Sequence, residues 1–310
     1  MLLGRMKKLA LKISLFVLAS LSIPGQLAFG SCDLTNLNQY EILDFKKSSV
    51  SKTEDSWVIK VDGVGGVYQI GATVYPARPT RLSVAKEVAD QMILFPTIEG
   101  ESLLEKRVGS YFARRDFFVV IPTIEELNLV FDEGTVCRMD QMALRVQQSA
   151  ILIFSELERL VPGGRQVMIG ASQGGIRSIS ASSVLPRLHA VWANVAGGDF
   201  PSIYAESTVR AITSFRTEHM AVLGLSVPSD YEAFLRSNLT LDPIQSCPER
   251  SGRLAMVIAL NDGSVPTANQ QLLRESCAPD YVRFLEGGHI RGAADLWLKR
   301  REVRKFLEQN

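Results

Sequence analysis

The sequence predicts an α/β fold with a mostly parallel central sheet and helices on both faces. Short runs rich in β-branched and other apolar residues alternate along the chain with longer segments of helical periodicity. Most of these runs are almost continuously apolar, which is typical of strands buried on both faces. Two strands around a glycine-rich turn precede the alternating region and indicate an antiparallel hairpin at the start of the sheet.

The predicted elements follow the chain in that order. The hairpin strands are residues 57–61 and 68–75. Six further strands are expected at residues 92–95, 117–121, 166–169, 190–195, 254–260 and 281–285. Helices are expected at residues 102–114, 138–160, 174–184 and 267–275, and a terminal helix at residues 293–307. This order of strand and helix favours right-handed crossovers within one sheet.

A long insertion interrupts the alternation after residue 198. The connection over residues 199–250 is far longer than an ordinary loop and contains two predicted helices, residues 204–222 and 229–236. We expect it to form a helical cap or lid over the carboxyl edge of the sheet. Residues 31–310 would then be one domain with a cap insertion at about 199–250, and a separate second domain is the alternative.

The composition is that of an ordinary globular protein. Of the 310 residues, 46% are hydrophobic and 22% charged, and 34 Lys plus Arg oppose 33 Asp plus Glu, so the formal net charge is +1. This balance argues against nucleic acid as a partner. The basic run formed by Lys299, Arg300, Arg301, Arg304 and Lys305 is interpreted as the solvated face of the terminal helix, with contact to an anionic surface as the alternative.

Residues 1–30 have the pattern of a secretory signal peptide. They contain four basic residues and no acidic residue, then an apolar run over residues 13–23, then Ala28-Phe29-Gly30. The apolar run is shorter than the roughly 20 residues that span a bilayer. We therefore expect a secreted or periplasmic protein with no integral membrane span after signal removal. Cys32 follows a segment that resembles a bacterial lipoprotein signal, so lipid anchoring at Cys32 is the alternative.

Export favours disulfides between the four cysteines, Cys32, Cys137, Cys247 and Cys277. They form no C-x-x-C pair and have no histidine at metal-ligand spacing, which argues against a zinc site. Three pairings are possible. Cys247 with Cys277 is the first choice because both flank one predicted strand unit, and buried free thiols are the alternative.

Gly170-Ala171-Ser172-Gln173-Gly174 matches the G-x-S-x-G pattern of a nucleophile elbow. A predicted strand leads into the motif and a helical pattern leaves it, as an elbow requires. The sharp turn exposes the Ser172 hydroxyl, and the two glycines remove side chains that would collide across the turn. The alternative is a glycine-rich turn with an incidental serine.

A nucleophilic serine needs a base, and the chain contains three histidines, His189, His219 and His289. His189 precedes a predicted strand and so lies at the opposite edge of a parallel sheet from Ser172. His219 falls in the insertion, where a solvated or cap-packing role is expected. His289 follows the last predicted strand, on a flexible loop at the same edge as Ser172, and is the predicted base.

The third member is expected to be an acid at that same edge. Asp262 follows the strand at residues 254–260 and gives the chain order Ser172, Asp262, His289. Asp199, just after the strand at residues 190–195, is the competitor and otherwise a turn former or cap hinge. Asp295, inside the terminal helix, is the weakest candidate.

With these motifs the sequence resembles a secreted serine esterase or peptidase of the α/β-hydrolase superfamily. The resemblance rests on the Ser172 elbow, the Asp262 loop with its Val265-Pro266, and the Gly287-Gly288-His289 ending. It implies an oxyanion hole formed by the backbone N–H of Gln173 and of Ile98, with Thr97 as the near alternative to Ile98. The chain departs from the family at Pro96-Thr97, where a His-Gly pair is common.

The resemblance and the residues together predict a secreted serine hydrolase that cleaves a carboxylic ester through Ser172, His289 and Asp262. The expected partner is a small-molecule ester, and no metal or organic cofactor is expected. A serine peptidase or amidase with the same residues is the alternative. A non-catalytic binding protein is a third hypothesis, which the ordered serine, acid and histidine disfavour.

Overall fold

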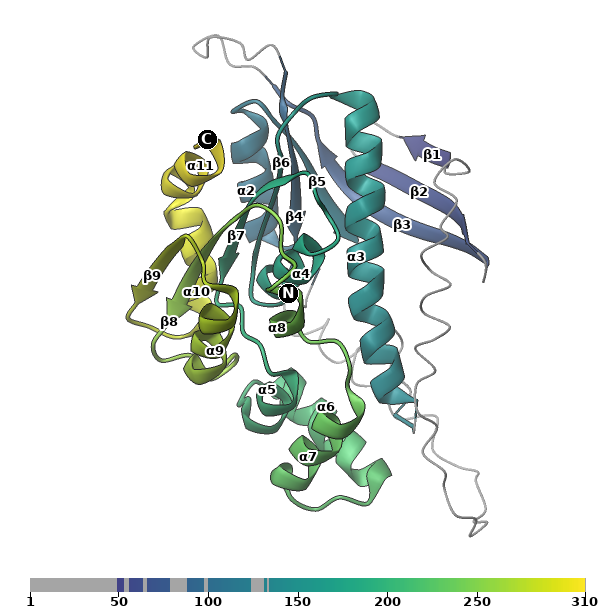
Figure 1. The fold of residues 1–310 in the computed structure, drawn as a ribbon, viewed down its shortest axis with the longest axis vertical. Helices are drawn as coiled ribbons and strands as arrows, with labels where there is room; N and C mark the ends of the chain where they lie inside the picture. Colours follow the sequence, from purple (N-terminus) through teal and green to yellow (C-terminus); the bar gives the residue numbers. More distant parts are fainter. Residues whose placement is uncertain are drawn as a thin grey trace, which may run out of the picture. The chain divides into compact units, whose positions relative to one another are not determined.

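The computed structural model describes residues 49–309, apart from residues 53–55, 64–65, 79–87, 98–99, 124–130 and 133 (Figure 1). The predicted signal peptide at residues 1–30, Cys32 and Ile98 lie outside the described residues. Within the described part of the chain, no helix is both long enough and apolar enough to cross a membrane.

The described strands form one sheet, in the order β1-β2-β3-β5-β4-β6-β7-β8-β9 (Figure 1). The pairs from β1 to β5 along this order are antiparallel, and every later pair is parallel. The sheet is therefore mostly parallel and contains the predicted antiparallel hairpin, β2–β3, near one edge. The strands are β1 Ser49–Lys52, β2 Ser56–Gly63, β3 Gly66–Tyr75, β4 Asp90–Phe95, β5 Phe117–Thr123, β6 Gln166–Ala171, β7 Leu188–Asn194, β8 Arg253–Ala259 and β9 Tyr281–Leu285.

The two ends of the sheet differ from the prediction. The short strand β1 was not predicted, and it extends the hairpin by pairing with β2 from Ser49↔Lys60 to Lys52↔Trp57. β9 was predicted to be buried on both faces, but Phe284 is 46% exposed. The reason is its position: among the described strands, β9 ends the sheet and pairs with β8 alone.

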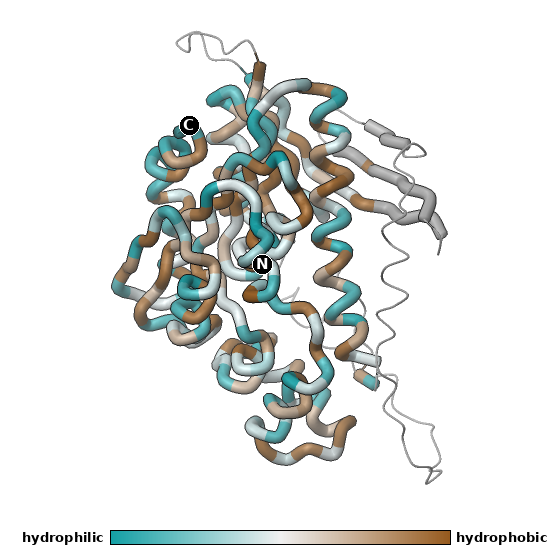
Figure 2. Tube along the Cα trace, viewed as in Figure 1, coloured by the Kyte–Doolittle hydropathy of each residue, from teal (hydrophilic) through white to brown (hydrophobic). Residues whose placement is uncertain are grey.

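Helices on both faces of the sheet create two apolar cores. Ile93 and Phe95 of β4 belong to one core, and Met92 and Leu94 to the other. Because successive side chains of a strand point to opposite faces, a strand between two cores is apolar throughout. Figure 2 shows hydrophobic colour concentrated on the central strands, while α3 alternates along its length. The first core includes α3 Thr135–Leu160, α4 Gln173–Ser182 and α9 Thr267–Cys277; the second includes α2 Leu103–Ala113, α10 His289–Leu298 and α11 Arg300–Glu308.

The predicted terminal helix is in fact two helices, and it begins four residues early. α10 starts at His289, and Lys299, with φ −106° and ψ 19°, breaks the helix before α11. The change of direction allows α11 to place Val303, Phe306 and Leu307 in the second core. Burial of these three side chains outweighs the strong local preference of the segment to continue one helix.

A disulfide joins Cys247, just after the short helix α8 (Pro243–Ser246), to Cys277, the last residue of α9. This is the pairing that the sequence favoured. It closes a separation of 30 residues, and a loop of that size corresponds to roughly 3 to 4 kcal/mol of stabilisation through the unfolded state. Cys137 is also disulfide-bonded.

The insertion forms a helical cap of four helices, α5 Phe200–Glu206, α6 Arg210–Leu223, α7 Pro228–Asn238 and α8 Pro243–Ser246. The predicted helix at residues 204–222 is divided into α5 and α6. The Arg216 side chain donates to the carbonyls of Tyr204 and Ala205 at the end of α5, at 2.9 and 2.5 Å. The N–H of Thr208 donates to the carbonyl of Gly263 at 2.9 Å, so the break between the two helices contacts the loop that carries Asp262.

Two carboxylates, the half-buried Asp242 and the buried Asp140, hold the start and the return of the cap. Asp242 accepts hydrogen bonds from the N–H groups of Asp199 and Phe200, at 3.1 and 2.6 Å. Asp140 of α3 accepts from the N–H of Leu241 at 2.8 Å. Each carboxylate satisfies backbone donors at the place where the chain changes direction. Asp242 therefore joins the start of the cap to its return, and Asp140 attaches the return to α3.

His219 has a packing role inside the cap. Its residue surface is fully buried, and its Nδ1 lies 2.9 Å from the hydroxyl of Tyr231. Burial lowers the pKa of His219 to about 4; the charge of Arg138 lowers it further and that of Asp132 opposes the shift. The folded protein therefore holds His219 neutral at pH values where an unfolded chain would protonate it.

This burial predicts acid sensitivity of the cap. The ordinary histidine pKa is about 6.5, so the stability is fully present above that pH and falls as the pH drops from about 6.5 towards 4, because the unfolded state takes up a proton first. Urea unfolding measured across this range should give an unfolding free energy whose slope against pH corresponds to the uptake of up to one proton. The slope should be reduced in His219→Gln. An identical slope in that variant would show that other groups cause the acid sensitivity.

Candidate active site

Ser172 lies at the sharp turn between β6 and α4. Its backbone has φ 55° and ψ −125°, a conformation that a residue with a side chain rarely adopts. The N–H of Ser172 donates to the carbonyl of Asn194 at 2.8 Å, which ties the turn to the end of β7. Such strain persists only where the surrounding structure enforces it, and here it presents the hydroxyl at the carboxyl edge of the sheet.

The glycines of the motif explain why the turn can close. A Cβ at Gly170 would lie 2.3 Å from the backbone carbon of Gly174. A Cβ at Gly174 would lie 2.2 Å from the carbonyl oxygen of Phe95 at the end of β4. Both distances are far below van der Waals contact, so neither position accepts a side chain without backbone movement.

Ser172, His289 and Asp262 form one hydrogen-bonded line. His289 Nε2 lies 2.8 Å from Ser172 Oγ, and His289 Nδ1 lies 2.8 Å from Asp262 Oδ2. An ionised carboxylate only accepts hydrogen bonds, so Nδ1 carries the proton and Nε2 accepts from the serine hydroxyl. The structure thus brings together the three residues that sequence reasoning had chosen, although they are separated by up to 117 positions.

Asp262 is held rigidly in the loop after β8. Its side chain is fully buried, and Oδ1 accepts from the N–H groups of Ser264 and Val265 at 2.8 and 3.0 Å. Oδ2, which faces His289, also accepts from Nε2 of Gln270 at 3.0 Å. Both carboxylate oxygens are therefore oriented before any substrate is present.

The sequence predicted His289 on a flexible loop. The structure instead has it as the first residue of α10. Gly287 allows the approach to the helix with φ 137°. Further along, a Cβ at Gly292 would lie 2.2 Å from Cγ1 of Val195, so this helix packs closely on the end of β7. The imidazole is placed by a docked helix, and its side chain remains 21% exposed.

Asn194 connects the Ser172 turn to the helix α10 that carries His289. The sequence analysis did not predict this role. It is fully buried. Its carbonyl accepts from Ser172 N–H, and its amide donates to the carbonyl of Gly292 in α10 at 2.9 Å. Trp192 Nε1 donates to the Asn194 side-chain oxygen at 2.6 Å and fixes the amide orientation. A polar residue that ends an apolar strand run was the signal in the sequence.

The other histidine and aspartate candidates, His189, Asp199 and Asp295, have partners other than Ser172 and His289. His189 Nε2 contacts the carbonyl of Gln309 at 2.8 Å, at the start of β7. Asp199 pairs with Arg236 of α7 at 3.0 Å and lies at the start of the cap with φ 60°. Asp295 pairs with Arg283 of β9.

Of the predicted oxyanion donors, Gln173 and Thr97 lie within the described residues. Gln173 is the first residue of α4, and a first-turn N–H has no acceptor within its own helix. Thr97, the near alternative to Ile98, directs its N–H to the Glu105 side chain at 3.4 Å. Arg177 of α4 donates to the carbonyl of Pro96 at 3.3 Å, so the start of the loop after β4 is held against the elbow helix.

No protein-family model matches the chain, and no curated protein matches its sequence. Solved structures resemble the described fold. Acetyl xylan esterase from Paenibacillus sp. R4 has a TM-score of 0.64 and 14% identity, over 89% of this chain and 92% of its own. Acetyl xylan esterase 1 from Thermoanaerobacterium sp. JW/SL YS485 has 0.61 and 15%, over 93% and 100%.

A third similar structure is the acylaminoacyl peptidase of Pyrococcus horikoshii, with a TM-score of 0.57 and 14% identity over 84% of this chain. This chain spans about half of that peptidase, 49% of its length. These likenesses, with the sheet order and the strand–elbow–helix connection, define the fold. The chain has the α/β-hydrolase fold that the resemblance implied, with the helical cap insertion that the long connection predicted.

Proposed function

We propose that the protein is a serine hydrolase that cleaves a carboxylic ester through a covalent acyl-enzyme. The observation that carries the proposal is the hydrogen-bonded line from Ser172 through His289 to Asp262, with 2.8 Å at each step. The strained elbow supports it, because strain of this kind clusters at functional sites.

In the proposed acylation step, Ser172 Oγ attacks the ester carbonyl while His289 Nε2 takes its proton. Asp262 keeps the Nδ1–H tautomer and stabilises the imidazolium that forms. The imidazolium then protonates the leaving alcohol as the tetrahedral intermediate collapses. In deacylation, His289 takes a proton from water as the water oxygen attacks the acyl carbonyl. The tetrahedral intermediate then collapses: the bond between the acyl carbon and Ser172 Oγ breaks, the imidazolium returns its proton to Oγ, and the carboxylic acid leaves.

The developing oxyanion is proposed to be stabilised by the N–H of Gln173 and by that of Ile98. Loss of one such donor typically costs about 3 to 4 kcal/mol of transition-state stabilisation. The positive end of α4 adds to this field at its first turn. The occupied N–H of Thr97 favours Ile98 over Thr97 as the second donor.

The similar structures include both esterases and a peptidase, so they support a hydrolase of either kind. The two acetyl xylan esterases match over nearly their whole length, whereas the peptidase matches over half of its own. We therefore propose an esterase and keep a peptidase or amidase as the second candidate. The test is a matched series of p-nitrophenyl esters and p-nitroanilides with the same acyl groups: faster ester cleavage beyond the intrinsic reactivity difference supports the proposal, and preferential anilide cleavage contradicts it.

We also propose export through residues 1–30. The disulfides of Cys247–Cys277 and of Cys137 support a location in an oxidising compartment.

Gln270 is predicted to position the acid. It is fully buried, donates to Asp262 Oδ2 and to the carbonyl of Val265, and accepts from Ala259 N–H. Gln270→Met should lower the unfolding free energy by about 1 to 3 kcal/mol, because buried partners lose their hydrogen bonds. It should also move the acid limb of the pH profile of kcat/KM to higher pH, because Oδ2 then offers its full charge to His289 and favours the imidazolium.

Urea unfolding and the pH–rate profile measure these two effects separately. Gln271→Met, a partly exposed position on the same helix, is the matched control and should change neither. A Gln270→Met protein that is less stable but has an unmoved acid limb would show that Gln270 serves the fold alone.

A further inference from the structure

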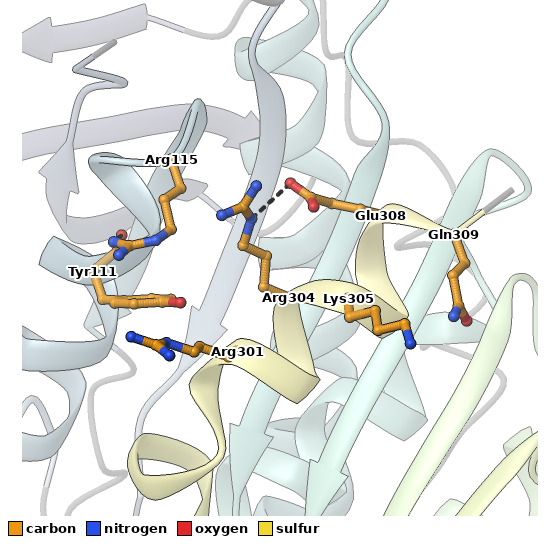
Figure 3. Close-up of a pocket in the computed structure, with 7 residues that line it drawn as sticks. All are labelled: Tyr111, Arg115, Arg301, Arg304, Lys305, Glu308 and Gln309. Atoms are coloured by element: carbon orange, nitrogen blue, oxygen red, sulfur yellow. Dashed lines mark hydrogen bonds and ion pairs between the residues drawn. The ribbon is translucent and has the colours of Figure 1, made fainter. Parts of the chain in front are cut away.

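A groove of about 490 Å³ opens between the end of α2 and the outer face of α11 (Figure 3). α2 leads directly into the start of β5, so the groove lies at the amino edge of the parallel strands. Ser172 follows the carboxyl end of β6, at the opposite edge. The groove is therefore separate from the candidate active site.

Helical spacing gathers cations on one wall of the groove. α11 buries Val303, Phe306 and Leu307 in the core. Arg301, Arg304 and Lys305 occupy the remaining face, three and four residues apart, where their side chains are neighbours. Like charges at this spacing repel, and an anion bound between them would relieve the repulsion.

The second wall is built by Tyr111 and Arg115 of the α2 terminus. The guanidinium of Arg115 lies 3.6 Å from the centre of the Tyr111 ring and donates to the Tyr111 carbonyl at 3.0 Å. Figure 3 shows Arg115 and Arg301 on either side of that ring, and Arg304 between the two walls. Stacking on an aromatic ring keeps a guanidinium oriented while its outer N–H groups can still donate.

The groove has a marked charge excess. Its walls contain Arg115, Arg301, Arg304 and Lys305 against one acid, Glu308, a formal charge of +3 in a chain whose total is +1. Arg304 Nε donates a hydrogen bond to Glu308 at 2.9 Å. This bond raises the pKa of Arg304, and the charge of Asp116 contributes in the same direction. Within the described residues, neither Arg301 nor Lys305 forms an ion pair.

The framework under the cations is rigid. Arg165, paired with the buried Asp90 at 2.8 Å, donates to the carbonyl of Glu308 at 2.6 Å. Arg253 donates to the carbonyls of Phe306 and Gln309, each at 2.6 Å. The carboxyl end of α11 is thus fixed to the sheet, and ligand binding there would order few further groups.

We propose that this groove binds the phosphate group of a phosphate monoester. A phosphate monoester carries about −1.5 to −2 charges at pH 7 and matches the fork of arginine donors. The groove is larger than a phosphate ion, so the organic part of the ligand has room beside Tyr111 and Gln309. The same chemistry is offered by a soluble phosphate monoester and by the headgroup of phosphatidic acid.

Calorimetric titration tests the proposal with glycerol 3-phosphate, inorganic phosphate and uncharged glycerol on the full-length protein. Glycerol 3-phosphate is expected to bind and glycerol is not, and the apparent Kd should rise with NaCl. A flotation assay with phosphatidylcholine vesicles, with and without phosphatidic acid, forms the second arm. Binding only to the phosphatidic acid vesicles would assign the lipid headgroup as the source, and binding only in solution would assign the soluble ester.

Arg301→Ala/Lys305→Ala should weaken either form of binding at least tenfold. Arg187→Ala/Arg210→Ala removes the same charge from two exposed sites outside the groove and should change it less than twofold. All four positions are exposed, so both variants should retain the wild-type melting temperature. No binding in either arm, or equal weakening by the two double variants, would overturn the proposal.

Discussion

Ser172→Ala and His289→Ala are each expected to lose on the order of 10⁶ in kcat for ester hydrolysis, with the double variant scarcely worse than either single one. The three residues act as a unit: without Oγ there is no acyl-enzyme, and without Nε2 the hydroxyl is not deprotonated. Stopped-flow and long-time assays with a p-nitrophenyl ester measure the change.

Both variants should fold normally, because each substitution removes a polar side chain from a partly exposed position. Equal melting temperatures serve as the control. A Ser172→Ala protein that keeps substantial activity would show that Ser172 is not the nucleophile. Multiplicative losses in the double variant would show that the two residues do not share one step.

Asp262→Asn is expected to lose on the order of 10⁴ in kcat with little change in KM. An asparagine that accepts from Ser264 and Val265 N–H would turn its NH₂ towards His289 Nδ1. The imidazole would then favour the opposite tautomer and present a proton, rather than a lone pair, to Ser172. The loss should therefore appear in the chemical step.

Asp199→Asn is the matched control, because Asp199 was the competing acid in the sequence. It pairs with Arg236 at the start of the cap, and its loss should leave kcat within a few-fold of the wild type. A larger effect of Asp199→Asn than of Asp262→Asn would reverse the assignment of the acid.

The sequence predicted the parallel part of the sheet well because its strands lie between two cores. β9 coincides with its apolar run, and each end of the other parallel strands lies within two residues of the end of its run. β1 was missed because Ser-Val-Ser-Lys carries no distinctive pattern. The break at Lys299 was missed because its neighbours are good helix formers, while the packing of Val303 and Phe306 in the second core is a tertiary contact that no local pattern shows.

The candidate site followed from topology, because the carboxyl ends of parallel strands meet at one edge. That rule placed Ser172, Asp262 and His289 together without any knowledge of contacts. It could not find Gln270 or Asn194, whose roles depend on partners in other elements. The amide of Asn194, for example, reaches a carbonyl 98 residues away, a relation that no local pattern encodes.

The most direct test of the proposed mechanism is reaction of the purified protein with a fluorophosphonate probe, followed by peptide mass spectrometry. One adduct is expected on Ser172, formed rapidly in the wild type and absent from Ser172→Ala. A wild-type protein that is folded by circular dichroism but does not react, or an adduct on another residue that persists in Ser172→Ala, would contradict a nucleophilic role for Ser172.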